Sequence, residues 1–476
     1  MADTKRFRGK KIAVLGFGVE SRETVEFLLK AGARLTLFDE KDEQEFDTSK
    51  LTHLRKEGVS FVFGPFDSFK DFDIIVRSPG IRPGIHALHE AGDLGIEITS
   101  ATNIFFEFAH GTTIGITGTK GKGTTAALLF QILKAVERDV YLGGNIGIPA
   151  LSFVEKLDGD SISILELSSF QLIDAQHSPA IAVLLMITED HLDYHLNADE
   201  YARAKIGIVR HQGKDDTVIA NLDYPSSLRI AEQSVAKKIY VSARKSIPEG
   251  CYVSGTDIVW KLGAREEKIA QTTDVLLPGK HNLENVCAAV AVAKVAGVEN
   301  KYIRETLKAF RGLTHRLQLV AEVKGVNYYN DSISTTPESA IAAIRAFNAP
   351  EILILGGSSK NSDFTELGKT ISSAHNIRAI IGIGAEWPRI KQKVSPTGRS
   401  AFGGKSHKFQ PKADPPLAGK IKIVENLRTM NEIVKKAHTL AEPGDVVILS
   451  PACASFDMFK DYKDRGDQFV KEITKL

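Results

Sequence analysis

The stretch TGTKGKGTT, residues 117–125, contains the residue types that hold a nucleotide phosphate. It follows a β-branched apolar run and precedes a helical pattern. Backbone N–H groups and the start of a helix can therefore bind an anion there, with Lys122 as a point charge. In the common P-loop pattern a hydroxyl residue follows the lysine directly, whereas here Gly123 does so and Thr124 comes next. We interpret the stretch as a phosphate-binding loop in which Thr124 is the magnesium-binding hydroxyl; a glycine-rich turn without a ligand is the competing interpretation.

Polar side chains follow two further apolar runs. LELSSFQL (165–172) places Glu166 at the end of one run, where a buried carboxylate requires a cation, so Glu166 indicates either a structural ion pair or a metal ligand. TEDHLDYH (188–195) gathers acidic residues and two histidines, which indicates a hard-metal or phosphate-adjacent site, or simply a polar loop. YARAK (201–205) places Lys205 on a helix, where a lysine taken alone is predicted to be solvated.

The N-terminal region contains half of a dinucleotide-binding pattern. Gly16-Phe17-Gly18 ends a short apolar strand, but Ser21 stands where the third glycine would be, and Asp39 ends the next strand. Ser78-Pro79-Gly80 ends another strand of the same region. Ligands bind beyond the carboxyl ends of parallel strands, so these turns favour a diphosphate or sugar-nucleotide site over plain strand–helix packing.

Alternating strand and helix patterns predict the parallel sheets that position these residues. We predict an α/β protein of three consecutive domains: a Rossmann-like domain at 1–100, a P-loop ATPase-like parallel sheet at 101–312 and a second Rossmann-like domain at 313–476. A small antiparallel excursion is expected at 252–270. The Pro/Gly/Lys-rich segment 395–420 lacks periodicity, and we expect a mobile loop outside the site.

Composition excludes several classes of function. The 476 residues carry a formal charge of +2, which indicates neither a nucleic-acid partner nor a strongly acidic one. Three widely spaced cysteines imply no disulfide framework. No apolar run approaches the length of a membrane helix, and the basic start lacks the apolar core of a signal peptide. We expect a cytoplasmic protein without a membrane partner.

Nine motifs, taken in order, resemble the Mur ligase family, and the resemblance spans essentially the whole chain. They are GITGTKGKGTT, GGNIG, LELSSFQL, TEDHLDYH, YARAK, PGKHNLENVCAA, HRLQ, YNDS and LSPACASFDMFKDYKDRG. In this family a glycine can stand between the P-loop lysine and the hydroxyl. The pattern is most similar to the branch that adds D-glutamate to UDP-N-acetylmuramoyl-L-alanine. The resemblance implies ATP-dependent amide formation through an acyl phosphate, and a monomer that works on these small-molecule substrates.

The resemblance also implies the roles of individual residues. For ATP it implies Gly118, Thr119, Lys120, Gly121, Lys122, Gly123, Thr124 and Thr125, with His281, Asn282, Asn285, Arg316 and Asp331. For two Mg²⁺ ions it implies Thr124, Glu166, His191 and Lys205. It implies that this lysine carries CO₂ as a carbamate. The catalytic residues that it implies are Lys122, Glu166, His191 and Lys205. For the UDP substrate it implies Gly16, Phe17, Asp39, Ser78, Gly80, Asn145 and Ser168. For glutamate it implies Lys360, Ser455, Phe456 and Tyr462.

One position departs from the common form of this ligase. There, a lysine that helps to bind the glutamate carboxylates follows the NDS motif, whereas this chain has Ile333. An isoleucine cannot pair with a carboxylate, so addition of L-glutamate competes with addition of D-glutamate as the predicted reaction. Three different classes of protein each fit part of the chain. They are a folylpolyglutamate-synthetase-type ligase, prompted by Gly123, a nicotinamide-dependent dehydrogenase built on the Gly16–Gly18 turn, and a non-catalytic nucleotide-binding regulator.

Overall fold

The computed structural model describes residues 4–18, 20–191, 194–359, 362–394 and 421–476. The segment 395–420, which we predicted to be a mobile loop, lies outside these ranges. The chain forms two compact units, one of residues 1–275 with 281–309 and the other of residues 276–280 with 310–476. None of the helices in the described ranges has the length and apolar content that a membrane crossing requires.

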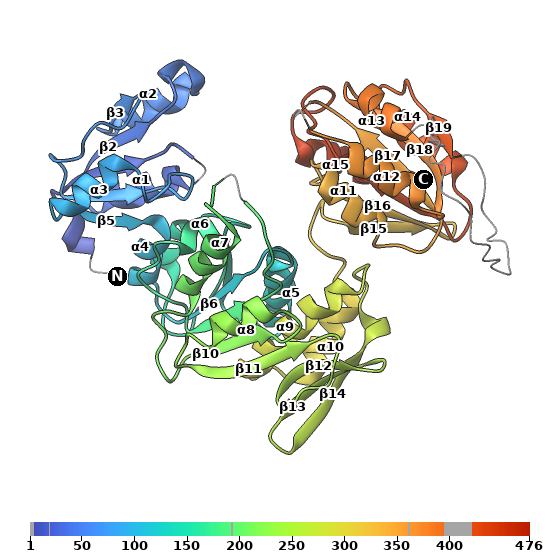
Figure 1. The fold of residues 1–476 in the computed structure, drawn as a ribbon, viewed down its shortest axis with the longest axis horizontal. Coiled ribbons are helices and arrows are strands. Elements are labelled where there is room, and N and C mark those ends of the chain that lie inside the picture. Colours follow the sequence, from blue (N-terminus) through green and yellow to red (C-terminus); the bar gives the residue numbers. More distant parts are fainter. Residues whose placement is uncertain (1–3, 19, 192–193, 360–361, 395–420) are drawn as a thin grey trace, which may run out of the picture. The chain divides into compact units, whose positions relative to one another are not determined.

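The first unit begins with a five-stranded parallel sheet in the order β3-β2-β1-β4-β5 (Figure 1). Its strands are β1 (Lys11–Leu15), β2 (Arg34–Asp39), β3 (Ser60–Phe63), β4 (Ile74–Arg77) and β5 (Glu97–Ser100). Its helices are α1 (Ser21–Lys30), α2 (Thr48–Lys56) and α3 (His86–Asp93), with the 3₁₀ turns η1 (Thr4–Phe7) and η2 (Glu43–Glu45). Strands β2 and β3 extend the sheet on one side of β1, and β4 and β5 extend it on the other. The carboxyl ends of β1 and β4 therefore lie together at the switch point, where such sheets bind ligands.

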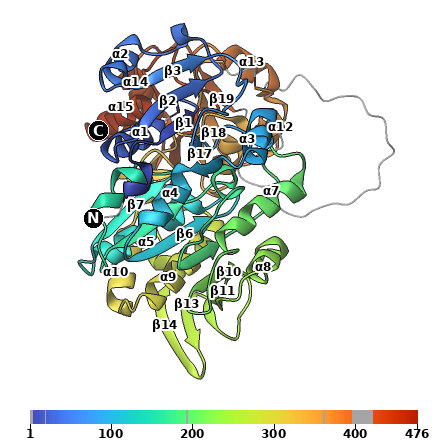
Figure 2. The same cartoon turned by 90° about the vertical axis from the view of Figure 1, so that its left-hand side faces the viewer.

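The same unit contains a nine-stranded sheet in the order β14-β13-β12-β11-β10-β9-β6-β8-β7. Its strands are β6 (Thr112–Thr117), β7 (Val140–Gly144), β8 (Ile162–Glu166), β9 (Ile181–Leu184), β10 (Thr217–Asn221), β11 (Lys237–Ser242), β12 (Gly250–Ser254), β13 (Asp257–Leu262) and β14 (Arg265–Gln271). Strands β6 to β12 are parallel, and β13 and β14 are antiparallel, so the predicted excursion is present as the hairpin seen in Figures 1 and 2.

Helices connect the strands of this sheet and cover its buried core. They are α4 (Ala101–Phe108), α5 (Lys122–Lys134), α6 (Ser169–Leu172), α7 (Ala198–Ala204), α8 (Pro225–Ala231), α9 (His281–Val295) and α10 (Asn300–Ala309). The 3₁₀ turns are η3 (Ala150–Ser152), η4 (Val154–Lys156), η5 (Lys205–Ile208) and η6 (Thr272–Asp274). Helix α9 is buried along its whole run from 284 to 293, because alanine, valine and cysteine occupy every face.

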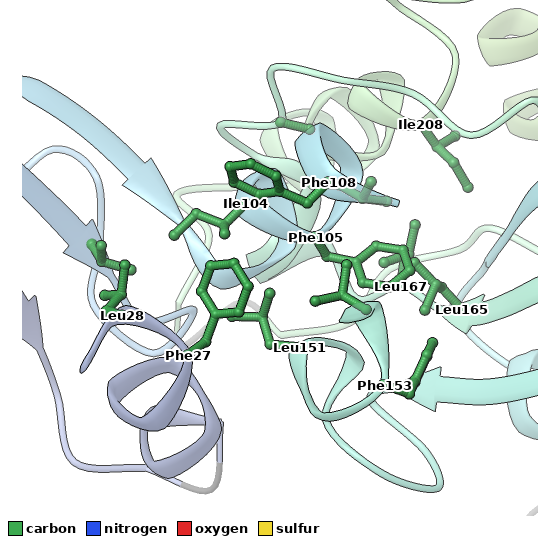
Figure 3. Close-up of a cluster of buried hydrophobic side chains, with 14 of the residues drawn as sticks. Phe27, Leu28, Ile104, Phe105, Phe108, Leu151, Phe153, Leu165, Leu167 and Ile208 are labelled. Carbon is green, nitrogen blue, oxygen red and sulfur yellow. The ribbon is translucent and has the colours of Figure 1, made fainter. Parts of the chain in front are cut away.

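One hydrophobic cluster joins the two sheets of the first unit. Figure 3 shows Phe27 of α1 beside Leu151 of η3, with Phe105 of α4 and Leu165 of the central sheet in the same cluster. These side chains are at most 5% exposed. Because the apolar contact is continuous, the two sheets are held together by hydrophobic burial, which is the main favourable term in folding.

The second unit is a six-stranded sheet in the order β15-β16-β20-β17-β18-β19. Its strands are β15 (Gln318–Val323), β16 (Val326–Asn330), β17 (Glu351–Gly356), β18 (Ile377–Ile383), β19 (Lys422–Val424) and β20 (Val446–Leu449). Its helices are α11 (Pro337–Ile344), α12 (Thr365–Ser373), α13 (Trp387–Val394), α14 (Met430–Leu440) and α15 (Tyr462–Ile473). Among the described strands of this sheet, only β15 pairs antiparallel. The three sheets confirm the predicted α/β architecture, while the domain limits at 100 and 312 stay predictions.

Candidate active site

The predicted phosphate-binding loop joins β6 to α5, and β6 lies between β8 and β9. Gly121 begins the helix with φ of 89°, and a Cβ there would lie 2.1 Å from Asn285 Oδ1. A Cβ on Gly118 would lie 2.9 Å from the Leu185 Cβ. Packing therefore requires glycine at both positions. The Lys122 Nζ donates to the Gly118 and Thr119 carbonyls, at 3.1 and 3.3 Å, so the ammonium lies against the loop.

Strand register places Glu166 beside this loop. Ile116 of β6 pairs with Glu166, the last residue of β8. The carboxylate is 6% exposed and accepts a 3.1 Å hydrogen bond from the Asn145 amide. Its charge acts on the buried Lys205, whose ammonium form it favours. The structural ion pair and the metal ligand therefore stay alternative predictions for this carboxylate.

The two threonines that follow Gly123 differ in burial. Thr125 is 0% exposed, and its hydroxyl has no hydrogen-bond partner in the described structure. Thr124 is partly exposed at the start of α5. The Thr124 hydroxyl is thus the more accessible of the two, and its magnesium-binding role stays a prediction, as does the contact of Thr125 with ATP.

Lys205 is buried, contrary to the solvated lysine expected from YARAK alone. It caps α7 and begins η5, is 1% exposed, and donates to the Gly118 carbonyl at 3.2 Å and to Thr117 Oγ1 at 3.3 Å. Its Nζ lies 4.5 Å from the centre of the Tyr201 ring. Burial, reinforced by the neighbouring charge of Lys122, lowers the pKa of Lys205 well below its ordinary value. The site therefore favours a neutral amine next to the phosphate-binding loop.

His191 has the left-handed backbone conformation that non-glycine residues rarely adopt, with φ of 52°. Its ring packs 4.8 Å from that of Phe170 and its Nε2 lies 4.0 Å from Asp190 Oδ2. The Lys120 Nζ approaches the same oxygen at 3.9 Å. His191 is half exposed, so it remains accessible to a ligand, and backbone strain of this kind concentrates at functional sites.

His195, from the same motif, is in a different environment. It is 1% exposed, and its Nε2 lies 2.9 Å from Ser169 Oγ. Burial in the packing between α6 and α7 lowers the pKa of this imidazole, and the charge of Glu200 opposes that shift. His195 is therefore a structural residue, and Asp193 lies outside the described ranges.

Three of the residues predicted to bind ATP lie in the first two turns of helix α9. Asn285 forms the wall against Gly121, and its Nδ2 donates to Asn282 Oδ1 at 2.9 Å. Burial lowers the pKa of His281, the first residue of the helix. The loop and the start of α9 are thus adjacent within one unit. Arg316 and Asp331 belong to the other unit, so their approach to the same nucleotide stays a prediction.

The N-terminal turns meet at the switch point of the first sheet. A Cβ on Gly16, whose φ is 85°, would lie 3.2 Å from the side chain of Ser78. The Ser21 hydroxyl donates to the Gly16 carbonyl at 2.5 Å, which explains a serine where the fingerprint has glycine. Asp39 accepts from the backbone N–H groups of Phe17 and Lys41, at 2.7 and 3.0 Å.

Two further residues of the predicted UDP-substrate site differ in how far the structure constrains them. Gly80 has open space around it, so packing does not demand glycine there. Ser168 caps α6, its Oγ accepting from Gln171 N at 3.3 Å.

In the second unit, predicted residues gather where β16, β17 and β20 end. Asp331 accepts hydrogen bonds from the Ser334 hydroxyl and, at 2.8 Å, from the Ser450 hydroxyl, and burial raises its pKa to about 6. Ser455 is buried, and the exposed Phe456 donates its N–H to Ser358 Oγ at 3.1 Å.

At the same edge, the Tyr462 carbonyl accepts from Ser332 Oγ at 2.8 Å, which places the start of α15 next to the NDS motif. Lys360 lies outside the described residues.

Sequence reasoning missed several residues that the fold brings to these sites. Arg465 is 0% exposed and donates to Ser332 and to the Cys453 and Ala454 carbonyls. Because Ser332 directly precedes Ile333, the buried guanidinium lies next to the NDS motif. The buried Arg77 pairs with Asp174, whose side chain is 24% exposed, across 97 positions of sequence. The apolar run that ends in arginine, IIVR, is a local indication that Arg77 is buried, and nothing local marks Arg465 or Asp174.

The donor set suits a hard cation. The described residues contain no group of three His, Cys, Asp or Glu side chains placed to hold a metal. Mg²⁺, however, is commonly bound by one or two carboxylates together with substrate phosphates. The Glu166 carboxylate and the Thr124 hydroxyl, both beside the phosphate-binding loop, match that requirement.

Three α/β sheets, with a glycine-rich loop at the carboxyl end of β6 that fits a phosphate, define a multidomain protein of the nucleotide-binding class. The chain matches three family models along its length: Mur ligase MurD-like, N-terminal domain at 10–100, Mur ligase middle domain at 116–293, and Mur ligase, glutamate ligase domain at 315–453. The chain belongs to the Mur ligase family, whose members are ATP-dependent ligases that form an amide bond.

Curated relatives match the chain from end to end. UDP-N-acetylmuramoylalanine–D-glutamate ligase of Acetivibrio thermocellus is 36% identical over 475 residues, covering 99% of this chain and 98% of that one. The proteins of the same name from Pelotomaculum thermopropionicum and Geobacillus kaustophilus are 36% and 34% identical, covering 99% and 100% of both chains.

Solved structures share the fold. MurF from Acinetobacter baumannii superimposes with a TM-score of 0.56 at 15% identity, covering 100% of this chain and 93% of that one. UDP-N-acetylmuramate-alanine ligase MurC from Thermotoga maritima gives a TM-score of 0.54 at 16% identity, covering 98% and 99%. The family assignment replaces the dehydrogenase interpretation of the Gly16–Gly18 turn. The MurD-like match at 10–100 argues against a folylpolyglutamate-synthetase-type ligase.

Proposed function

We propose that this chain is an ATP-dependent ligase that joins D-glutamate to UDP-N-acetylmuramoyl-L-alanine, a step in the synthesis of peptidoglycan precursors. The observation that supports this most strongly is similarity over the whole chain to ligases that bear that name, at 33–36% identity. The arrangement of Lys122, Glu166 and Lys205 around one phosphate-binding loop supports the ATP-dependent part of the proposal.

The proposed reaction has two steps. The terminal carboxylate of the alanine attacks the γ-phosphorus of ATP, which gives an acyl phosphate and ADP. The neutral amine of glutamate then attacks the acyl carbon, and inorganic phosphate leaves from the tetrahedral intermediate. Such phosphoryl transfer depends on positioning and charge neutralisation more than on covalent help from the protein.

Residues of the loop supply part of that charge. The Lys122 ammonium and the N–H groups at the start of α5 are placed to hold the phosphates. Two Mg²⁺ sites would be formed by Thr124, Glu166, His191 and Lys205. The bound Mg²⁺ would neutralise the negative charge that develops on the phosphoryl oxygens.

We propose further that Lys205 carries a carbamate in the active enzyme. Its neutral amine adds to CO₂, forming an N–C bond and releasing one proton, and the product is a carboxylate. This converts a group that repels a metal ion into one that binds it. The burial of Lys205 against the Gly118 carbonyl supports this proposal, because desolvation disfavours the ammonium form of a buried lysine and so favours the amine that reacts with CO₂.

The substrates are assigned to the three domains as follows. Residues 1–100 hold the uridine diphosphate through Gly16, Phe17, Asp39, Ser78 and Gly80, and 101–312 hold ATP, with Asn145 and Ser168 toward the muramoyl peptide. Residues 313–476 hold glutamate through Lys360, Ser455, Phe456 and Tyr462, and contribute Arg316 and Asp331 to ATP. We further propose that the protein is a monomer and works in the cytoplasm.

Phosphate release from ATP tests the proposal. We expect release to depend on UDP-N-acetylmuramoyl-L-alanine and glutamate together, with neither substrate sufficient alone. Release that needs a folate substrate, or that occurs equally without the UDP substrate, would contradict it.

Ile333 favours L-glutamate as a second candidate for the added amino acid. In the second unit its N–H donates to the His315 carbonyl, and its apolar side chain offers nothing to a carboxylate. We expect kcat/KM to be higher for D-glutamate. A preference of tenfold or more for L-glutamate, about 1.4 kcal/mol, would establish the second candidate without changing the mechanism.

A further inference from the structure

Arg77 at the end of β4 is a buried cation whose three nitrogens are all hydrogen bonded. It is 1% exposed, and its Nε and Nη2 donate to the two carboxylate oxygens of Asp174 at 2.6 and 2.7 Å. Nη1 donates to the carbonyls of Ser78, Pro79 and Ile81 at 3.0, 3.3 and 2.5 Å. The guanidinium therefore shapes the turn 78–81, which we propose to hold the sugar nucleotide.

Tyr194 binds the same turn from the TEDHLDYH motif. Its hydroxyl donates to the Pro79 and Ile81 carbonyls at 3.1 and 3.2 Å, so Arg77 and Tyr194 share two acceptors. Its backbone N–H donates to the His191 carbonyl at 3.1 Å, which ties it to the proposed metal ligand.

Helix α6 is the third segment of the arrangement. The Phe170 carbonyl accepts from Arg77 Nη2 at 3.1 Å. The Phe170 ring lies 4.3 Å from that of Tyr194 and 4.8 Å from that of His191. The sugar-nucleotide turn, the segment that follows Glu166 and the His191 turn therefore meet at one guanidinium.

A purely structural role explains this arrangement poorly. The apolar cluster of Phe27, Phe105 and Leu151 already joins the two sheets, and replacing a buried ion pair by apolar side chains often leaves a protein equally stable or more stable. What an ion pair adds over an apolar contact is fixed direction, because each hydrogen bond has a narrow range of geometry.

We infer that Arg77, Asp174 and Tyr194 form a positioning unit that couples the sugar-nucleotide turn 78–81 to His191. This inference rests on the proposed function, which assigns the UDP substrate to that turn and Mg²⁺ to His191. Each ligand then favours the same arrangement of the unit, and by thermodynamic linkage each tightens the binding of the other by an equal factor. The three residues act through the carbonyls and rings that they hold.

Calorimetry on the full-length protein tests the coupling without requiring turnover. The dissociation constant of UDP-N-acetylmuramoyl-L-alanine is measured with saturating Mg²⁺ and with none, and the ratio of the two is the coupling factor. We expect a factor of about 5 or more for the wild type, the usual size of such couplings. Tyr194→Phe removes only the shared hydroxyl and Asp174→Asn only the charge, and both should reduce the factor to below about 2.

Tyr252→Phe is the matched control, because it also removes a hydroxyl that is hydrogen bonded to one acceptor, Glu266 at 3.1 Å, in the antiparallel hairpin. It should leave the factor unchanged. Thermal unfolding shows whether Tyr194→Phe and Asp174→Asn remain folded; if Asp174→Asn does not, Tyr194→Phe alone decides.

The positioning unit is overturned if Tyr194→Phe leaves the coupling factor unchanged. This includes the case in which the variant binds the UDP substrate more weakly, but by the same ratio with and without Mg²⁺. A wild type that binds the UDP substrate without coupling overturns it as well. A wild type that does not bind the UDP substrate overturns the proposed function and this inference with it.

Discussion

At the scale of single residues, burial decides the chemistry of the ionisable groups. Lys205 and Lys122 both donate a hydrogen bond to the Gly118 carbonyl, and of the two only Lys205 is fully buried. Desolvation penalises the charged form of a lysine, and a nearby cation adds to the penalty. The two lysines therefore have different proposed roles, Lys122 as a cation toward the phosphates and Lys205 as an amine that reacts with CO₂.

We predict that Lys205→Ala loses activity by about 100-fold or more, the scale of a lost partner for transition-state charge. Added short carboxylic acids should restore part of it, because they can occupy the space of the carbamate. Removal of bicarbonate should lower wild-type activity as well. The activities are measured as phosphate release, with the exposed Lys237→Ala as a control for loss of a surface lysine. Full activity of the Lys205→Ala variant would contradict the carbamate.

The burial of Glu351 makes the stability of the second unit depend on pH. It begins β17 with 0% exposure, and burial raises its pKa to about 8 from 4.5, while Asn376 stabilises the anion in part. The folded state therefore holds a proton that the unfolded state releases between about pH 4.5 and 8. Since the folded state binds more protons in this window, stability falls as pH rises through it.

We predict that Glu351→Gln, which cannot ionise, has a higher unfolding temperature than the wild type at pH 8 and nearly the same one at pH 5. Thermal unfolding followed by circular dichroism across this range measures the difference. The exposed Glu322→Gln is the control and should show no such trend. A difference that does not grow between pH 5 and pH 8 would show that Glu351 is ionised in the folded protein.

At the scale of elements, the close approach of α5 and α9 explains the glycine that begins α5. Gly121 and Gly58 have nearly the same positive φ, 89° and 85°. A Cβ on Gly121 would lie 2.1 Å from Asn285, whereas a Cβ on Gly58 would meet nothing within 4 Å. Both positions impose the strain of a left-handed alanine, and only Gly121 adds a collision with α9.

We predict that Gly58→Ala destabilises by about 1 kcal/mol and leaves ATP binding unchanged. Gly121→Ala should destabilise more and weaken ATP binding by about tenfold or more, because Asn285 has to move. Urea unfolding and nucleotide titration measure the two effects. Equal ATP affinity in the two variants would show that the Asn285 contact is not needed for the nucleotide site.

At the scale of the whole molecule, the chain is two compact units, and the proposed ATP residues belong to both. Arg316 and Asp331 lie in the second unit, while the loop and α9 lie in the first. A ligand that binds the folded state stabilises it in proportion to the logarithm of its concentration, about 2.7 kcal/mol at 100 times its Kd. ATP should therefore protect both units against unfolding if it contacts both.

We predict that a non-hydrolysable ATP analogue with Mg²⁺ raises the unfolding temperature of the wild type by about 4 °C or more at that concentration. Lys122→Ala should show a shift of less than about 1 °C, since the phosphates lose their main cation. Hydrogen exchange locates the effect: slower exchange near Gly121 alone, with none near Asp331, would contradict a nucleotide site shared by the two units.

The local parts of this protein could be predicted from its sequence. Strands such as 112–117 and the glycine-rich loop after it follow from β-branched runs and from backbone conformations that only glycine adopts easily. The family motifs carry the same kind of local information. Glu166 and the Gly16 turn were found in this way because each lies at the carboxyl end of an apolar strand, and His191 because it lies in the polar segment that follows another.

Only the tertiary structure decided which side chains are buried and which distant residues meet. Lys205 looked like a solvated lysine, and its burial follows from β6, α7 and η5 packing together. Arg77 and Asp174 are 97 positions apart, and Glu351 shows its raised pKa only once its strand lies inside a sheet. The physical reason is the same in each case: desolvation and directional hydrogen bonds depend on neighbours in space, and no local pattern of sequence specifies those.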